Sequence, residues 1–121
     1  MTVKVLIVDD VEQVRYDLRT LLSLSGDIEI VGEAANGLEA IKEVATLQPD
    51  VVILDLEMPT MDGYQTARHI KARDSSCRVI VLSVHAYPEA QQNALRAGAD
   101  HFIVKGTPID SLIQTILGKK N

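Results

Sequence analysis

Carboxylate, hydroxyl and ammonium groups stand directly after the apolar runs of this sequence. In chain order they are Asp9 and Asp10, Asp55, Ser83 and Lys105. Carboxylates that converge repel one another, so one of them acquires a raised pKa unless a cation lies between them. A hard divalent cation such as Mg²⁺ takes one or two carboxylates and leaves positions for phosphate oxygens. A carboxylate beside such a cation can attack phosphorus and form an aspartyl phosphate, with a lysine and a hydroxyl on the other phosphoryl oxygens.

The apolar runs before these groups are typical of strands that are buried on both faces. The expected strands are Val3–Val8, Ile28–Val31, Val51–Leu54, Val79–Leu82 and Phe102–Val104. Segments with helical spacing of apolar residues separate them, so strand and helix alternate five times. This alternation predicts an α/β fold, a doubly wound five-stranded parallel sheet with helices on both faces. Right-handed crossovers leave few topologies, of which the flavodoxin-like order 2-1-3-4-5 is the common one.

Start signals mark four of the five expected helices. They are Asn36 with Glu39, Asp62 with Gln65, Pro88, and Thr107–Pro108. The helix after Asn36 is expected to bury a stripe made of Leu38, Ile41 and Val44.

Ligands of such folds bind beyond the carboxyl ends of the strands, where strands one and three lie side by side. Because neighbouring strands are about 4.8 Å apart, Asp9, Asp10 and Asp55 are expected to converge there. Strand two, outside that crevice, ends in Ala34–Ala35 without a polar group. A single aspartate after a strand is more often a turn residue or a helix cap, which is our interpretation of Asp62.

Composition bounds the class of protein. The 121 residues are expected to form one domain, 1–121, large enough for a core of its own. A net charge of −5 argues against direct nucleic-acid binding and against docking on an anionic membrane. The lone Cys77 cannot form an intramolecular disulfide and fits a reducing compartment. No apolar run has the length of a membrane span, so a cytoplasmic location is expected.

Five motifs together resemble the receiver domain of two-component response regulators, from Val3 to Leu117. They are VLIVDD, VVILDLEMPTMDG, VIVLSVHA, AGAD and FIVK. The resemblance implies that Asp55 is the phosphoacceptor and that Mg²⁺ is the cofactor. It further implies Asp10 as a direct metal ligand, Asp9 as a ligand through water, and the backbone carbonyl of Glu57 as the third protein ligand.

The same resemblance assigns the residues that respond to phosphorylation. Ser83 and Lys105 would contact the phosphoryl group, and Phe102 would turn inward when Ser83 moves. The face formed by the fourth helix, the fifth strand and the fifth helix would then change and signal to an output domain or partner protein. Glu57 and His85 lie two residues past Asp55 and Ser83, at positions that tune phosphoryl lifetime in the family, although both also fit solvated loop residues.

The resemblance also implies partners. A sensor histidine kinase would supply the phosphoryl group, and phosphorylation could produce a homodimer. The segment VGEAANGLEAI and the Lys105–Gly106 step are most similar to receivers of LuxR/NarL-type regulators, which implies transcription regulation. Gly106 stands where many receivers carry a proline after a cis bond, so a trans bond is expected. A stand-alone receiver acting by protein contact or in a phosphorelay is the alternative.

Other functions fit the residues less well. A phosphatase working through an aspartyl phosphate would use a second acid, and the Asp55-Leu56-Glu57 step offers one, but the Asp9–Asp10 pair has no place in that scheme. A flavin or nucleotide binder needs a loop rich in Gly, Ser or Thr after strand one, where this chain has acids. We therefore expect no enzyme activity beyond self-phosphorylation and autodephosphorylation.

Overall fold

The computed structural model describes residues 2–58, 61–85 and 87–118. Pro59, Thr60 and Ala86 of the quoted motifs lie outside the described residues, as does the polar tail 119–121. No helix of the described part is long and apolar enough to cross a membrane.

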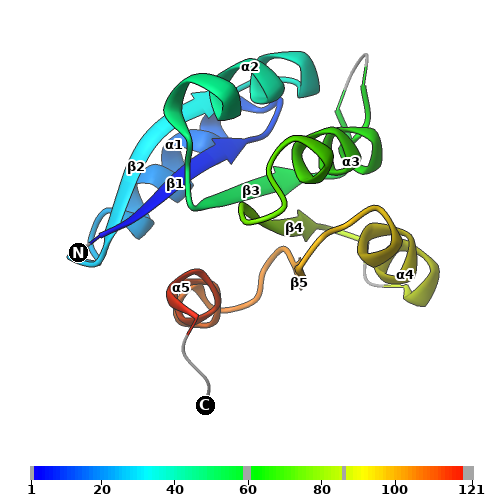
Figure 1. Ribbon diagram of the computed structural model, residues 1–121. Helices are drawn as coiled ribbons and strands as arrows, with labels where there is room; N and C mark the ends of the chain where they lie inside the picture. The colour runs from blue at the N-terminus through cyan, green and yellow to red at the C-terminus, as the bar shows by residue number, and fades with distance from the viewer. Residues whose placement is uncertain (1, 59–60, 86, 119–121) are drawn as a thin grey trace.

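Five parallel strands form one sheet in the order β2-β1-β3-β4-β5, as predicted. The strands are β1 Val3–Val8, β2 Ile28–Ala34, β3 Val51–Asp55, β4 Arg78–Ser83 and β5 His101–Val104. The helices are α1 Glu12–Leu22, α2 Gly37–Leu47, α3 Gly63–Arg73, α4 Pro88–Arg96 and α5 Ile109–Leu117. Figure 1 shows β1, β3 and β4 running side by side with their arrowheads pointing to the same edge.

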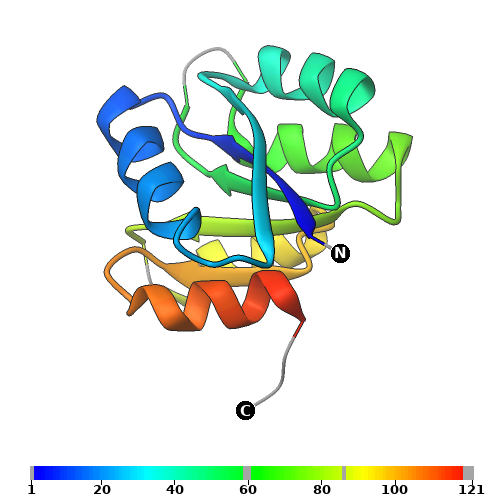
Figure 2. The same ribbon diagram turned by 90° about the vertical axis from the view of Figure 1, so that its left-hand side faces the viewer.

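Helices cover both faces of the sheet, so the protein has two hydrophobic cores. The strand residues alternate between them, because successive side chains of a strand point to opposite faces. Leu6, Val8 and Leu54 pack under α2, α3 and α4. Ile7 and Ile53 pack on the other side, against α1 and α5. Figure 2 shows α1 and α5 on one side of the sheet and α2 and α3 on the other.

The helix caps follow the sequence signals, with one difference of geometry. The Asn36 side chain accepts a hydrogen bond from the N–H of Glu39, and Asp62 accepts one from Gln65. The Glu39 carboxylate accepts from the N–H of Ala35 rather than from Asn36 itself. Asp62 is therefore a helix cap, as interpreted from the sequence.

Two expectations about β2 and α2 were wrong. Strand β2 extends to Ala34, three residues beyond the expected end, because Leu6 to Val8 of β1 continue to pair with it. In α2 the side chain expected to be buried, Leu38, is 51% exposed, whereas Ala40 is fully buried. Helix α2 packs closely on α3, because a Cβ on Gly37 would lie 2.3 Å from the Thr66 hydroxyl. This close approach turns the small residues inward.

Helix α3 begins against the peptide that carries Asp55. The N–H of Gly63 donates to the carbonyl of Leu56 at 2.9 Å. A Cβ on Gly63 would lie 2.5 Å from the Asp55 carbonyl oxygen and 2.6 Å from Leu56 Cα, which are both backbone atoms. Glycine is therefore required here by space.

Gly63→Ala is expected to lower the free energy of unfolding by about 1–3 kcal/mol, since overpacking must displace α3 or β3. Helix propensity alone predicts the opposite sign, because alanine favours a helix by about 1 kcal/mol over glycine. Urea denaturation of the variant measures the difference. Gly26→Ala is the matched control, because its Cβ would meet nothing within 4 Å. A Gly63→Ala protein as stable as the parent would contradict the required close approach.

Candidate functional site

Three carboxylates converge at the carboxyl edge of the sheet. One oxygen from each of Asp9, Asp10 and Asp55 lies within 4.8 Å of the others. The β1–β3 register places Val8 beside Leu54, so the residues that follow this pair in the chain, Asp9 and Asp55, come together. The convergence expected from the sequence is confirmed at the switch point between β1 and β3.

Asp55 is the buried nucleophile candidate of this cluster. It is 7% exposed, and one of its carboxylate oxygens accepts a hydrogen bond from the N–H of Glu57 at 3.3 Å. Burial, followed by the charge of Asp9, raises its pKa from 3.8 to about 6, against the opposing effect of Lys105. The predicted raised pKa thus falls on Asp55. Its carboxylate is still mostly ionised at neutral pH and is available as a nucleophile.

Lys105 brings the only cation that directly contacts the carboxylates among the described residues. Its Nζ lies 3.2 Å from an Asp9 oxygen and 3.7 Å from an Asp55 oxygen. Lys105 follows β5, and its N–H donates to the carbonyl of Ser83, which fixes the start of the β5–α5 connection. The Lys105–Gly106 bond is trans, as expected. The Lys105 ammonium thus lies at the carboxylate cluster.

The donor set fits a hard divalent cation. All three side chains offer oxygen, the kind of ligand that Mg²⁺ prefers, and Asp10 and Asp55 line an open cavity of ≈ 710 Å³ that leaves room for water and phosphate oxygens. Asp9 is 2% exposed, whereas Asp10 is exposed and lines the cavity. Direct binding by Asp10 and binding through water by Asp9 stay predictions. Glu57 also lines this cavity. The role of its backbone carbonyl stays a prediction.

Ser83 and Phe102 lie beside the carboxylates rather than among them. Ser83 is buried at the end of β4, and its hydroxyl accepts a hydrogen bond from the N–H of His85 at 3.1 Å. In the described part of the chain it makes no hydrogen bond to the three aspartates. Phe102 is half-buried on β5 opposite Val81, on the side of the sheet covered by α4. Because residues 81 and 83 share a face, Phe102 and Ser83 are near neighbours on that side.

Glu57 and His85 meet across the mouth of the site. The His85 ring nitrogen contacts the Glu57 carboxylate, and the His85 ring lies 5.3 Å from that of Tyr87 between centroids. The Glu57 side chain is 63% exposed and that of His85 is 37% exposed. Nothing in the residue order pairs them, because they belong to loops that only the sheet brings together. Of the two, Glu57 lines the cavity that Asp55 also lines.

One contact of the site was missed by the sequence interpretation. Arg15, on α1, donates from Nη1 to the backbone carbonyl of Asp9 at 2.7 Å. Its spacing from Asp9 is six residues, which is no helical repeat, since the loop after β1 lies between them. In the sequence Arg15 is a charged residue between apolar positions of this helix, so no signal pointed to its contact with Asp9.

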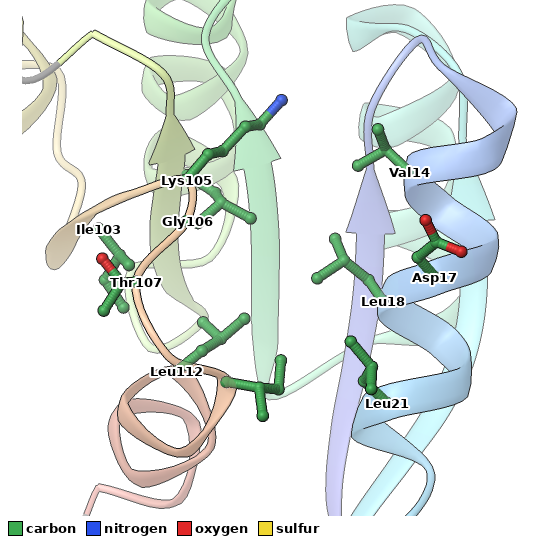
Figure 3. Close-up of a pocket in the computed structure, with 11 residues that line it drawn as sticks. Val14, Asp17, Leu18, Leu21, Ile103, Lys105, Gly106, Thr107 and Leu112 are labelled. Carbon is green, nitrogen blue, oxygen red and sulfur yellow. The ribbon is translucent and has the colours of Figure 1, made fainter.

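A second, more apolar cavity of ≈ 300 Å³ lies between α1 and the β5–α5 connection. Figure 3 shows Val14, Leu18 and Leu21 of α1 on one side of it, with Ile103 and Leu112 on the other. Lys105 and Gly106 belong to its lining, although the figure shows the Lys105 amino group extending away from the aliphatic side chains. The lysine backbone therefore borders this cavity, while its ammonium group contacts the carboxylates of Asp9 and Asp55.

Comparisons with known proteins agree with this geometry. Residues 5–117 match the family of response regulator receiver domains. The response regulator protein VraR of Staphylococcus aureus is 39% identical over 116 residues, which cover 96% of this chain and 56% of VraR. The chain thus spans about half the length of the curated relatives it matches.

Solved structures give the same result. The signal receiver domain of the NarL response regulator from Mycobacterium tuberculosis superposes with a TM-score of 0.92 at 34% identity, covering 97% of this chain and 94% of that one. A DNA-binding response regulator of the LuxR family from Staphylococcus aureus gives a TM-score of 0.89 at 31% identity, over 96% and 97% of the two chains. With its site geometry and a match over residues 5–117, this chain belongs to the response regulator receiver domains, and its relatives are regulators of the LuxR/NarL type.

Proposed function

We propose that this chain accepts a phosphoryl group on Asp55 from a sensor histidine kinase, in a Mg²⁺-dependent reaction, and passes the signal on by a change of surface. Receiver domains are signalling domains of two-component response regulators, generally not enzymes, and they bind Mg²⁺ through acidic residues. The observation that carries the proposal is the buried Asp55 carboxylate, which lies between two other carboxylates and a lysine at the edge of an open cavity.

The chain's own groups divide the work of phosphoryl transfer. An Asp55 oxygen attacks phosphorus as the bond between phosphorus and the donor's leaving atom breaks, which leaves an acyl phosphate. Asp10 and Asp55, with Asp9 through water and the carbonyl of Glu57, would hold Mg²⁺. When bound, the metal neutralises charge on the phosphoryl oxygens. The Lys105 ammonium, already within 3.7 Å of Asp55, pairs with a further phosphoryl oxygen.

The response would travel along one side of the sheet. A phosphoryl group adds charge and acceptor oxygens at Asp55, and it competes for the Ser83 hydroxyl with the N–H of His85. Movement of Ser83 frees space beside Val81, where half-buried Phe102 can turn inward. The α4-β5-α5 face then repacks. Phosphorylation shifts the two populations only by the difference in its interaction energy with them.

The output and its setting belong to the same proposal. The relatives VraR and the LuxR-family regulator favour transcription regulation through an output domain or partner contacting the α4-β5-α5 face, in the cytoplasm. Homodimer formation on phosphorylation would fit such an output, and so would a stand-alone receiver that acts by protein contact. Glu57, which lines the cavity beside Asp55, and His85, which contacts Glu57, are proposed to govern how readily water reaches the acyl phosphate.

Acetyl phosphate tests the reaction without knowledge of the kinase. With Mg²⁺ present, intact-mass spectrometry is expected to show the addition of one phosphoryl group, and peptide mapping after borohydride reduction is expected to place it at Asp55. Chelation of Mg²⁺ is expected to abolish the addition. Labelling at another residue, or labelling that persists without the metal, would refute the proposed chemistry.

A further inference from the structure

The Arg15 side chain joins three elements behind the acidic cluster. From α1, its Nη1 donates to the Asp9 carbonyl at 2.7 Å, and its Nε donates to a Glu33 carboxylate oxygen on β2 at 3.0 Å. The second Glu33 oxygen accepts from Nε of Arg19 at 2.7 Å. The Arg15 side chain is only 15% exposed, compared with 43% for Arg19. The partly buried, planar guanidinium of Arg15 is therefore held by Asp9 through one nitrogen and by Glu33 through another.

The Arg15 guanidinium adds the last of four contacts that hold Asp9 in place. The Asp9 N–H donates to the Ala34 carbonyl at 3.1 Å, and one carboxylate oxygen accepts from the Val11 N–H at 2.9 Å. The other oxygen accepts from Lys105 at 3.2 Å. The contact with Arg15 occupies the carbonyl, which is the remaining polar atom of the residue. Every polar group of Asp9 is thus held by a different residue.

Asp10 has no such support of its own. It is exposed, and among the residues that the structure describes no side-chain hydrogen bond fixes its carboxylate. Its position is set by the Asp9–Asp10 peptide plane, since the peptide is rigid and the Asp9 carbonyl defines its orientation. Whatever holds that carbonyl therefore fixes the position of the Asp10 Cα, from which the side chain starts.

The positive charge of Arg15 is compensated by the Glu33 carboxylate that it contacts. Burial alone would raise the pKa of Glu33, but hydrogen bonds from Arg19 and Arg15 outweigh it and lower that pKa, so Glu33 is a carboxylate at neutral pH. A carboxylate so close to the guanidinium limits the repulsion that Arg15 exerts on a cation at the acidic cluster. Arg15 can thus position a metal ligand at little electrostatic cost.

We propose that Arg15, anchored by Glu33, is a positioning residue that presets the Asp9–Asp10 peptide for binding of a divalent cation. The inference rests on the proposed function, because it assigns a role toward the metal of that site. Residues that orient metal ligands from outside the coordination sphere change metal affinity by about 10–100-fold. Arg15 acts through a backbone carbonyl, so we expect a value near the lower end, about tenfold.

Arg15→Gln tests the inference with a readout that stability alone does not move. Isothermal titration calorimetry of the full chain with Mg²⁺ is expected to give a Kd about tenfold higher than that of the unaltered protein. Thermal denaturation in a chelator measures the structural cost separately. Arg19→Gln is the matched control, because it removes the same charge and the same partner, Glu33, without a contact to Asp9. It is expected to lower metal-free stability by less than Arg15→Gln does, because Arg19 is more exposed, and to leave the Kd for Mg²⁺ within about twofold of that of the unaltered protein.

A second variant keeps the test decisive if Arg15→Gln folds poorly. Arg15→Lys retains the charge but not the planar guanidinium that reaches both Asp9 and Glu33. Its Kd for Mg²⁺ is therefore expected to lie between those of the unaltered protein and of Arg15→Gln. The inference is overturned if the folded Arg15 variants bind Mg²⁺ like the unaltered protein, or if Arg19→Gln weakens binding as much as Arg15→Gln. Failure of the unaltered protein to bind Mg²⁺ would instead remove the proposed function, and this inference with it.

Discussion

Asp55→Asn is expected to abolish phosphoryl labelling and at the same time to stabilise the metal-free protein at neutral pH. The amide has no nucleophilic carboxylate, so no acyl phosphate can form. It is nearly isosteric and keeps an oxygen for the N–H of Glu57, so packing and the 3.3 Å hydrogen bond are retained. What the substitution removes is a buried charge that lies beside Asp9. Function and stability therefore conflict at this residue.

The sign and size of this stability difference follow from the pKa of Asp55. A rise from 3.8 to about 6 means that ionisation is disfavoured by folding. Well below 3.8, the pKa of the unfolded state, the group is neutral in both states and costs nothing. As pH rises from about 4 to 6, the native protein loses stability relative to the asparagine variant, and above pH 6 the difference levels off at about 3 kcal/mol for a shift of about two units. The stabilisation by Asp55→Asn is thus expected at pH 7.5 and should vanish near pH 3.5.

Urea denaturation in a chelator at both pH values measures this difference. Asp27→Asn, at an exposed position, makes the same charge change and is expected to alter stability by no more than about 0.5 kcal/mol. Saturating Mg²⁺ should reduce the difference in stability between the native protein and Asp55→Asn, because the metal binds the carboxylate form. An Asp55→Asn protein that is less stable than the native one at pH 7.5 would show that the carboxylates do not repel as the geometry indicates.

Lys105→Gln is expected to slow phosphorylation by acetyl phosphate by about 10²–10³-fold while leaving Mg²⁺ binding intact or tighter. The slowing follows from loss of the preplaced cation at the developing phosphoryl charge. Binding does not suffer, because the Lys105 ammonium itself occupies the carboxylates that would hold the metal, at 3.2 Å from Asp9 and 3.7 Å from Asp55. Slower phosphorylation without weaker Mg²⁺ binding separates a catalytic role of Lys105 from a structural one.

The pH profile adds an independent readout. The charge of Lys105 lowers the pKa of Asp55, so its removal moves that pKa further upward. The labelling rate of Lys105→Gln should therefore fall at a higher pH than that of the native protein as the solution is acidified. Lys42→Gln is the control, an exposed lysine on α2 for which no ion pair occurs within the described residues. Equal labelling rates for native protein and Lys105→Gln would show that the ammonium does not contact the phosphoryl group.

Much of this site was predictable from residue order alone. Short apolar runs alternating with helical periodicity determine a parallel sheet, and parallel strands deliver their last residues to one edge. Asp9, Asp10, Asp55 and Lys105 therefore meet whatever the details of packing. The chain order of the polar residues carried this information, and the structure confirms it.

Packing decided what the residue order could not. The raised pKa of Asp55 has burial as its largest cause, and burial is a property of the tertiary structure. The buried face of α2 depends on its close approach to α3, which places Ala40 inward and Leu38 outward.

The contact of Arg15 with the Asp9 carbonyl, and that of His85 with Glu57, depend on the paths of side chains across loops. Sequence periodicity describes positions along one element. Distances between elements are set by the volumes that fill the space between them, so these contacts were decided only by the tertiary structure.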